Sequence, residues 1–282
     1  MPRWQPIHEN HAIDVMAAVV TFAQPLPDRL LSAVFKVSEE AAFSVGLKSR
    51  HSSSGIQFTV GPTGIVPSPS APQGLLFNAL FETEAGEPIP GKIAEQLQID
   101  SMSVIYRTWR YVSWSWQTER MKSLMSPALR VVASAVAMNK MRLEYLDRFK
   151  FDGPAADARA SGLLQIGSPY VSPAIFDAES HWHSHMGTFL AEAGGQSKRL
   201  QQVNVDALDQ PDLAAPEMPI RWVNITTARE DRYVEAGVAD HEINADIVFG
   251  DFDRLHAELK VLLAEVITAD LAAKIYLTDQ KQ

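Results

Sequence analysis

Apolar positions in the first half of the chain predict strands interrupted by two helices. An Ile-, Val- and Ala-rich run predicts a buried strand over 12–22. Apolar residues at helical spacing predict a helix over 28–42 with Asp28 as its cap, and a longer one over 113–135 with a kink or break at Pro127. Further strands are expected over 55–60, 75–82, 92–99, 102–110 and 138–151.

Turn-forming residues set the expected boundaries. A Pro-, Ser- and Gly-rich stretch predicts a surface loop over 61–74. A second interruption near 151–160 separates two patterned halves, so we expect one compact unit made of an N-terminal subdomain, 1–153, and a C-terminal subdomain, 154–282.

The second half opens with a short apolar run over 163–166, followed by a helix or loop around 168–177. It then predicts a hairpin and a C-terminal helix. The hairpin begins near Glu179 and turns at Gly194-Gly195. A strand follows over 220–227, and the C-terminal helix is expected to begin at a cap provided by Asp251 or Asp253. Hairpins interrupted by a few long helices predict an α+β fold, with a mainly antiparallel sheet and helices packed on one side. Both halves follow a strand-then-helix order, which leaves a duplicated core as an alternative.

Composition narrows the function classes. The net charge of the 282 residues is −9, which argues against a nucleic-acid partner because such proteins usually cluster Lys and Arg on one face. There are no cysteines, so disulfides, thiolate nucleophiles and Cys-ligated zinc are excluded. The first residues lack the apolar core of a signal peptide, and no apolar run approaches the roughly 20 residues that span a bilayer. We therefore expect a cytoplasmic protein with no membrane partner.

Three histidines at every second position are the strongest local hint of chemistry. In a strand, His181, His183 and His185 share one face. A turn at Gly194-Gly195 places His185 opposite Asn204 and His183 opposite Asp206. The three histidines extend over about 13 Å, so at most adjacent pairs could share an ion. We favour a solvent-facing polar ladder; the alternative is a divalent metal held by these histidines with Asp206.

An aromatic segment provides a second candidate. Core packing at a strand-to-helix junction is the favoured interpretation of its side chains. The alternative is a pocket that binds a small ligand, with adjacent arginines adding cation–π contacts. The residues concerned are Tyr106, Trp109, Tyr111, Trp114 and Trp116.

The same segment takes part in a resemblance. The motifs that carry it are Tyr106-x-x-Trp109 before a long helix, Met141-Arg-Leu-Glu-Tyr-Leu-Asp-Arg148 on the next strand, an apolar strand ending in a breaker over 15–27, and Leu255-His256-Ala257-Glu258-Leu259 in a C-terminal helix. In these motifs the chain resembles a sporadically distributed bacterial family of uncharacterised proteins. It departs from the family pattern at Glu144, where Arg is usual, and at Asp147, where Asn is common. The resemblance implies a shared fold and a gene on mobile or defence-related loci; it assigns no catalytic residues.

Three functions follow from these observations. We favour a noncatalytic interaction or regulatory protein, which binds a protein partner or a second copy of itself and needs no cofactor. The first alternative is a metal-dependent enzyme that uses His183, His185 and Asp206. The second is a small-ligand sensor built on the aromatic segment.

Overall fold

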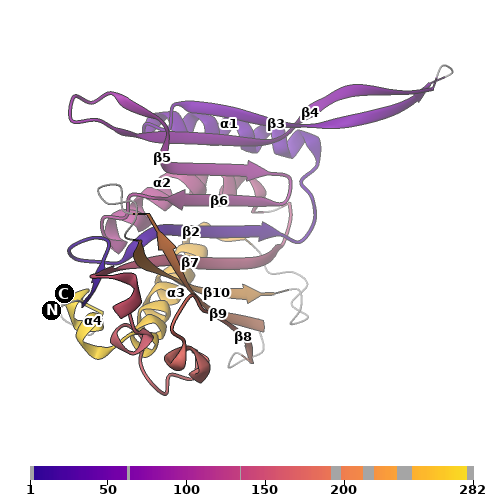
Figure 1. Cartoon of the computed structure of the whole chain (residues 1–282). Coiled ribbons are helices and arrows are strands. Elements are labelled where there is room, and N and C mark those ends of the chain that lie inside the picture. The colour runs from indigo at the N-terminus through magenta and orange to yellow at the C-terminus, as the bar shows by residue number, and fades with distance from the viewer. Residues whose placement is uncertain are drawn as a thin grey trace. The chain divides into compact units, whose positions relative to one another are not determined.

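Four α-helices and ten β-strands form in the part of the chain that the computed structural model describes, which is 3–61, 64–133, 135–191, 198–211, 219–233 and 243–277 (Figure 1). The helices are α1 (Asp28–Ser44), α2 (Trp114–Val132), α3 (Ala245–Val266) and α4 (Ala269–Lys274). The strands are β1 (Arg3–Pro6), β2 (Ile13–Phe22), β3 (Ser49–Gly61), β4 (Gly64–Glu82), β5 (Pro88–Asp100), β6 (Ser103–Thr108), β7 (Met138–Asp152), β8 (His183–Ala191), β9 (Lys198–Gln210) and β10 (Ile220–Arg232).

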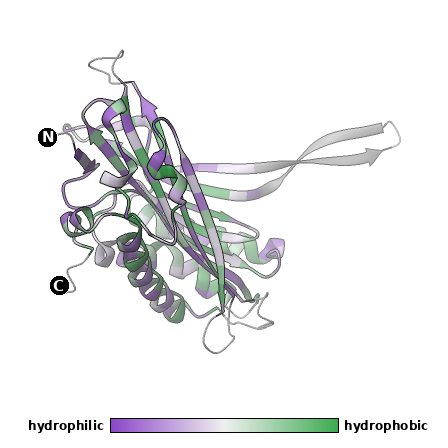
Figure 2. Ribbon diagram, turned by 60° about the horizontal axis from the view of Figure 1, so that its bottom comes forward, coloured by the Kyte–Doolittle hydropathy of each residue, from purple (hydrophilic) through white to green (hydrophobic). Residues whose placement is uncertain are grey.

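The predicted fold class, α+β with a mainly antiparallel sheet, is confirmed. Strand pairs β3–β4, β4–β5, β5–β6, β8–β9, β9–β10 and β1–β7 are all antiparallel. Hydropathy alternates along the strands in the way that a sheet with one packed face requires (Figure 2). Among the described residues, no helix is both long enough and apolar enough to cross a membrane.

Residue contacts group the chain into two compact units, each of which joins segments from both sides of residue 153. We call them the aromatic unit, Ala17–Met141 with Tyr233–Gly250, and the histidine unit, Met1–Met16 with Arg142–Arg232 and Asp251–Gln282. Strands β2 and β7 contribute residues to both units. The division into 1–153 and 154–282 stays a prediction.

In the aromatic unit, strands pair in the order β3-β4-β5-β6-β2. Helix α1 begins after Pro27, so Asp28 is its first residue and not its cap. Helix α2 has the expected side-chain cap, since the hydroxyl of Ser113 accepts a hydrogen bond from the Trp116 amide at 3.3 Å. The helix continues unbroken through Pro127, so the alternative of a break there is wrong.

The loop predicted over 61–74 is wrong for most of its length. Backbone pairing from Ile56 with Pro69 to Gly61 with Gly64 makes this stretch the outer part of the β3–β4 hairpin. Strand β4 pairs with β5 only from Gly74 onward, so the hairpin runs past β5 (Figure 1). The prolines of this stretch predicted a loop. They are compatible with a strand here because its outer side has no hydrogen-bonded neighbour.

In the histidine unit, strands pair in the order β7-β10-β9-β8, and β1 pairs with the end of β7. Odd-numbered residues of β7, β9 and β10 are mostly buried and even-numbered ones mostly half-buried. The short apolar run over 163–166 follows a 3₁₀ turn, Ala160–Gly162, and in place of a strand it forms one isolated bridge, between Leu164 and Ile267. Another 3₁₀ turn, Pro173–Asp177, lies in the stretch expected to be a helix or loop.

Helix α3 starts before either predicted cap. The Asn244 side chain accepts hydrogen bonds from the amides of Asp246 at 3.0 Å and Ile247 at 3.4 Å, so Asn244 fulfils the capping role. Asp251 lies within the helix, where its carboxylate accepts a hydrogen bond from Arg254 at 3.0 Å.

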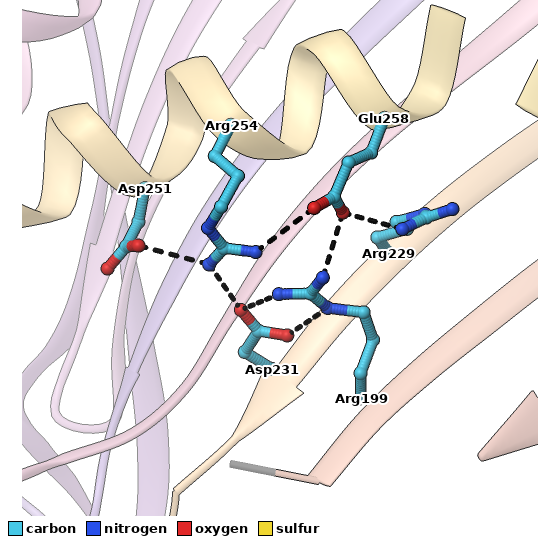
Figure 3. A network of polar contacts seen from close by, with 6 residues as sticks. All are labelled: Arg199, Arg229, Asp231, Asp251, Arg254 and Glu258. Carbon is cyan, nitrogen blue, oxygen red and sulfur yellow. Dashed lines mark hydrogen bonds and ion pairs between the residues drawn. The ribbon is translucent and has the colours of Figure 1, made fainter. Parts of the chain in front are cut away.

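A network of charges around the buried Arg199 and Asp231 holds α3 against the odd-numbered face of β9 and β10 (Figure 3). The Arg199 guanidinium donates to both Asp231 oxygens, at 2.6 and 2.8 Å. From the helix, Arg254 donates to Asp231 at 2.9 Å, and the Glu258 carboxylate accepts from Arg199 at 2.8 Å and from Arg229 at 2.5 Å. Because Asp231 is 1% exposed and holds two arginines, it is the centre of this attachment.

Replacing Asp231 by Ala should therefore destabilise the protein strongly. Arg199, 7% exposed, would lose its bidentate partner inside the protein, and breaking a buried pair in this way costs about 3 kcal/mol or more. The matched control is Glu119→Ala. The Glu119 side chain is 75% exposed and forms an ion pair with Lys122, so its removal should cost less than about 1 kcal/mol. Urea denaturation of both variants measures the difference, and equal losses would contradict this role for Asp231.

Candidate functional site

The β8–β9 hairpin confirms the predicted histidine register. His183 pairs with Asp206 and His185 with Asn204. The residues of the predicted turn, 192–197, lie outside the described part of the chain. His183 and His185 are exposed side chains of β8, as a solvent-facing ladder requires. His181 is 61% exposed but precedes the strand, so the ladder does not extend to it.

His181 and His185 each contact a carboxylate. His185 Nε2 lies 2.9 Å from Asp206 Oδ1, and His181 Nε2 lies 3.2 Å from Asp209 Oδ2. The rings of His183 and His185 are 5.3 Å apart between centroids. Within the described ranges, no group of three or more His, Asp and Glu side chains is arranged to hold a metal ion. A metal bound by His181, His183, His185 and Asp206 stays a prediction.

His183 and His185 belong to a larger surface that we call the open face: the even-numbered residues of β7, β9 and β10 with the odd-numbered residues of β8. The contacts with α3 described here come from the other face, through Arg199, Arg229 and Asp231. The open face is therefore the side of these strands that faces away from α3.

Cationic groups lie over aromatic rings at two places on the open face. The Arg148 guanidinium is 4.7 Å from the Trp222 ring centroid, and it also forms an ion pair with Asp14 at 3.2 Å. Near the edge, Arg232 and Lys198 lie 5.0 and 5.4 Å from the ring centroid of Phe189. These contacts position long cationic side chains along the sheet surface.

Between these two places, Arg142 connects three strands. Its guanidinium donates to Glu144 on the same strand, to Gln202 on β9 at 2.6 Å, and lies 3.7 Å from Glu230 on β10. Sequence reasoning missed this surface, although the alternation of polar residues over 198–210 was a usable signal. The pairing of β7 with β10, far apart in the chain, was not available from local patterns.

In the aromatic unit, Tyr106 is a core residue and is fully buried. Its hydroxyl donates to Glu95 at 2.7 Å, and Arg120 binds the same carboxylate at 2.6 Å. Burial, reinforced by Glu95, raises the pKa of Tyr106 well above its usual value. This arrangement supports the core-packing interpretation for Tyr106.

The other four aromatic candidates lie between the end of β6 and the first turn of α2. Trp109, Tyr111 and Trp114 are half-buried, while Trp116 is 36% exposed with Arg120 5.7 Å from its ring centroid. Binding of a ligand by these residues stays a prediction.

An open pocket of about 530 Å³ lies elsewhere, in the histidine unit. Trp4, Phe151 and Arg159 are among its lining residues, and none of the five aromatic candidates lines it. The Trp4 indole donates to the Arg159 carbonyl at 3.1 Å, and its ring packs edge-on against Phe151. These contacts give the pocket wall a structural role.

Two of the motifs that carry the family resemblance meet inside the histidine unit. Tyr145 on β7 and His256 on α3 are joined by a 2.8 Å hydrogen bond between Oη and Nδ1. Burial, with a smaller contribution from Lys260, lowers the pKa of His256 to about 3, so its ring is neutral in the folded protein. This contact is part of the packing between sheet and helix.

Asp147, two residues along β7 from Tyr145, is buried with both carboxylate oxygens lacking a hydrogen-bond partner. Burial raises its pKa to about 7. A carboxyl group in this setting is neutral in mildly acidic solution and becomes a buried charge above neutrality.

Comparisons with protein-family models and with curated proteins find no match to this chain.

The Asp147 carboxyl should make stability fall as pH rises. Its pKa is higher in the folded chain than in the unfolded one, so its contribution to stability is full below about pH 4, falls as pH rises from about 4 to 7, and levels off above that. The free energy of unfolding of Asp147→Asn, relative to that of wild type, should therefore be about 2–3 kcal/mol higher at pH 8 than at pH 5.

Urea denaturation at the two pH values measures this difference. Asp152→Asn is the matched control, because Asp152 is exposed at the end of the same strand. If the effect of Asp147→Asn were the same at both pH values, the carboxyl would not titrate as described.

Proposed function

We propose that this protein is a noncatalytic interaction or regulatory protein, and that the open face of the histidine unit binds its macromolecular partner. The observation that carries the proposal is the one-sided covering of β9 and β10. Helix α3 is fixed to one face by ion pairs (Figure 3). The other face holds half-exposed rings and paired charges.

The chemistry of the open face fits a protein surface. Arg142, Arg148 and Arg232 each have a carboxylate in contact, at Glu144, Asp14 and Glu230. Trp and Arg are enriched where protein interfaces derive most of their binding energy, and here they already stand in fixed positions. Paired charges of both signs favour a partner with complementary charges over the uniform negative charge of nucleic acid.

The sporadic bacterial family remains a proposal of the same kind. The hydrogen bond between Tyr145 and His256 supports membership of that family only in that two of the family's motifs pack together. A gene context on mobile or defence-related loci would fit an interaction protein.

The test replaces the aromatic residue at the centre of each candidate surface. Trp222→Ala should weaken partner binding at least about tenfold, because Trp at an interface centre typically contributes more than 1.4 kcal/mol. Trp116→Ala is the matched control, since it removes another Trp contacted by an arginine, in the aromatic unit.

A photo-crosslinking residue introduced at Asn204 identifies the partner in the cells that make the protein, and titration of that purified partner gives the affinities. Equal affinity for Trp222→Ala and wild type would overturn the proposed surface. Loss of binding in Trp116→Ala alone would favour the aromatic segment instead.

A further inference from the structure

Strand β8 forms one end of the strand order in the histidine unit (Figure 1). Its nine residues all pair with β9, from His183 with Asp206 to Ala191 with Lys198. Among the described residues, no strand pairs with its other side. One side of the β8 backbone is therefore a free edge.

The hydrogen-bond phase shows which residues present their backbone at this edge. The Trp182 carbonyl accepts a hydrogen bond from the Ala207 amide at 2.9 Å, which continues the β8–β9 register by one pair. In an antiparallel ladder, bonded and non-bonded pairs alternate. Even-numbered residues of β8 thus turn their N–H and C=O toward β9, whereas His183, His185, Gly187 and Phe189 turn theirs away.

The exposure of the strand agrees with this phase. Gly187 is exposed, and because it has no side chain, the exposed surface is backbone. Phe189 and Leu190, on opposite faces of the strand, are 51% and 41% exposed. The edge can therefore be reached by another strand.

This edge lacks the features that usually prevent strand addition. Its sequence, HSHMGTFLA, contains no proline and no Lys, Arg, Asp or Glu. The nine pairs with β9 run without a register shift, so no bulge twists the strand away. Natural proteins normally protect exposed edges with prolines, charges or bulges. An edge of this length, without proline, bulge, Lys, Arg, Asp or Glu, is suited to pairing.

We propose that the free edge of β8 pairs antiparallel with β8 of a second copy, about a two-fold axis at Gly187. Self-pairing is favoured because a strand without Lys, Arg, Asp or Glu meets its own copy without like charges from these residues, and a two-fold axis makes each contact occur twice. This register places Phe189 opposite the second copy's His185 and Leu190 opposite its Ser184. The exposed ring and the exposed aliphatic side chain would both gain a neighbour.

The inference deepens the proposed function by naming a second copy as one partner of the histidine unit, and it rests on that proposal. Pairing at β8 would extend the sheet, so that the open faces of the two copies become one continuous surface. Binding of a further partner to that surface would then gain from two linked sites.

Opposite charges at position 187 test both the edge and the register. A Cβ at Gly187 meets only ordinary contacts, the closest being 3.7 Å from Gln202, so a side chain fits there. Gly187→Lys and Gly187→Glu each place two like charges on the axis, and each should be monomeric at about 100 µM, where wild type is dimeric. An equimolar mixture of the two variants should restore the dimer. Sedimentation velocity measures all three samples.

Two controls separate pairing from folding. Gly187→Ala should remain dimeric, since it adds a side chain but no charge. His185→Pro should be monomeric with an unchanged circular dichroism spectrum, because it removes an outward N–H and leaves the bonds to β9 intact.

The failure of this inference and that of the proposed function look different. Monomeric wild type at about 100 µM, or dimers that persist in both charged variants, would overturn pairing at β8. Trp222-dependent binding of another protein would still support the open face in that case. If instead another protein's strand occupies the β8 edge, Gly187→Lys would abolish that binding while wild type alone stays monomeric, which overturns self-pairing.

Discussion

The attachment of α3 to the sheet through Asp231 is the interaction on which the rest of the histidine unit depends. Arg199 and Arg254 reach this carboxylate from the sheet and from the helix, and Glu258 binds Arg199 and Arg229 from above (Figure 3). Buried ions are costly unless each one is paired, so the network allows few alternative placements of the helix. It determines which face of β9 and β10 is covered.

The functional proposals follow from that constraint. Once α3 occupies one face, strand alternation places Arg148, Trp222, His183 and His185 on the other. The polar contacts of the open face then keep its arginines extended along the sheet and limit the entropy lost on binding. Strand β8 contributes both to the open face and to the free edge, so the same part of the protein offers a surface and an edge for binding.

The sequence allowed the local features to be predicted, because period and turn position are local properties. The strand over 12–22, the buried face of β7 and the pairing of His183 with Asp206 all follow from alternation and a turn position. The predictions that failed depended on context. Asn244 was missed as the cap of α3 because the apolar pattern pointed to Asp251, and the outer β3–β4 hairpin was hidden by its prolines.

The candidate site was predictable only in part. The histidine ladder and its solvent exposure came from spacing, but the Arg148–Trp222 contact required β7 and β10 to be neighbours, which no local pattern gives. The buried network is equally non-local, since Arg199, Asp231 and Glu258 come from three elements. Asp147 could be placed on the buried face from its alternation, whereas its lack of any partner could not.

Thiol labelling tests the central claim, that α3 covers one face of β9 and β10 and leaves the other face exposed to solvent. The chain has no cysteine, so single substitutions give unambiguous signals. Asn204→Cys lies on the open face. Val203→Cys lies next to it on β9 but on the opposite face, where Val203 is 1% exposed. We expect Asn204→Cys to react with maleimide at least about 100-fold faster than Val203→Cys in the native protein, with equal rates after unfolding in urea. Similar native rates at the two positions would contradict the account.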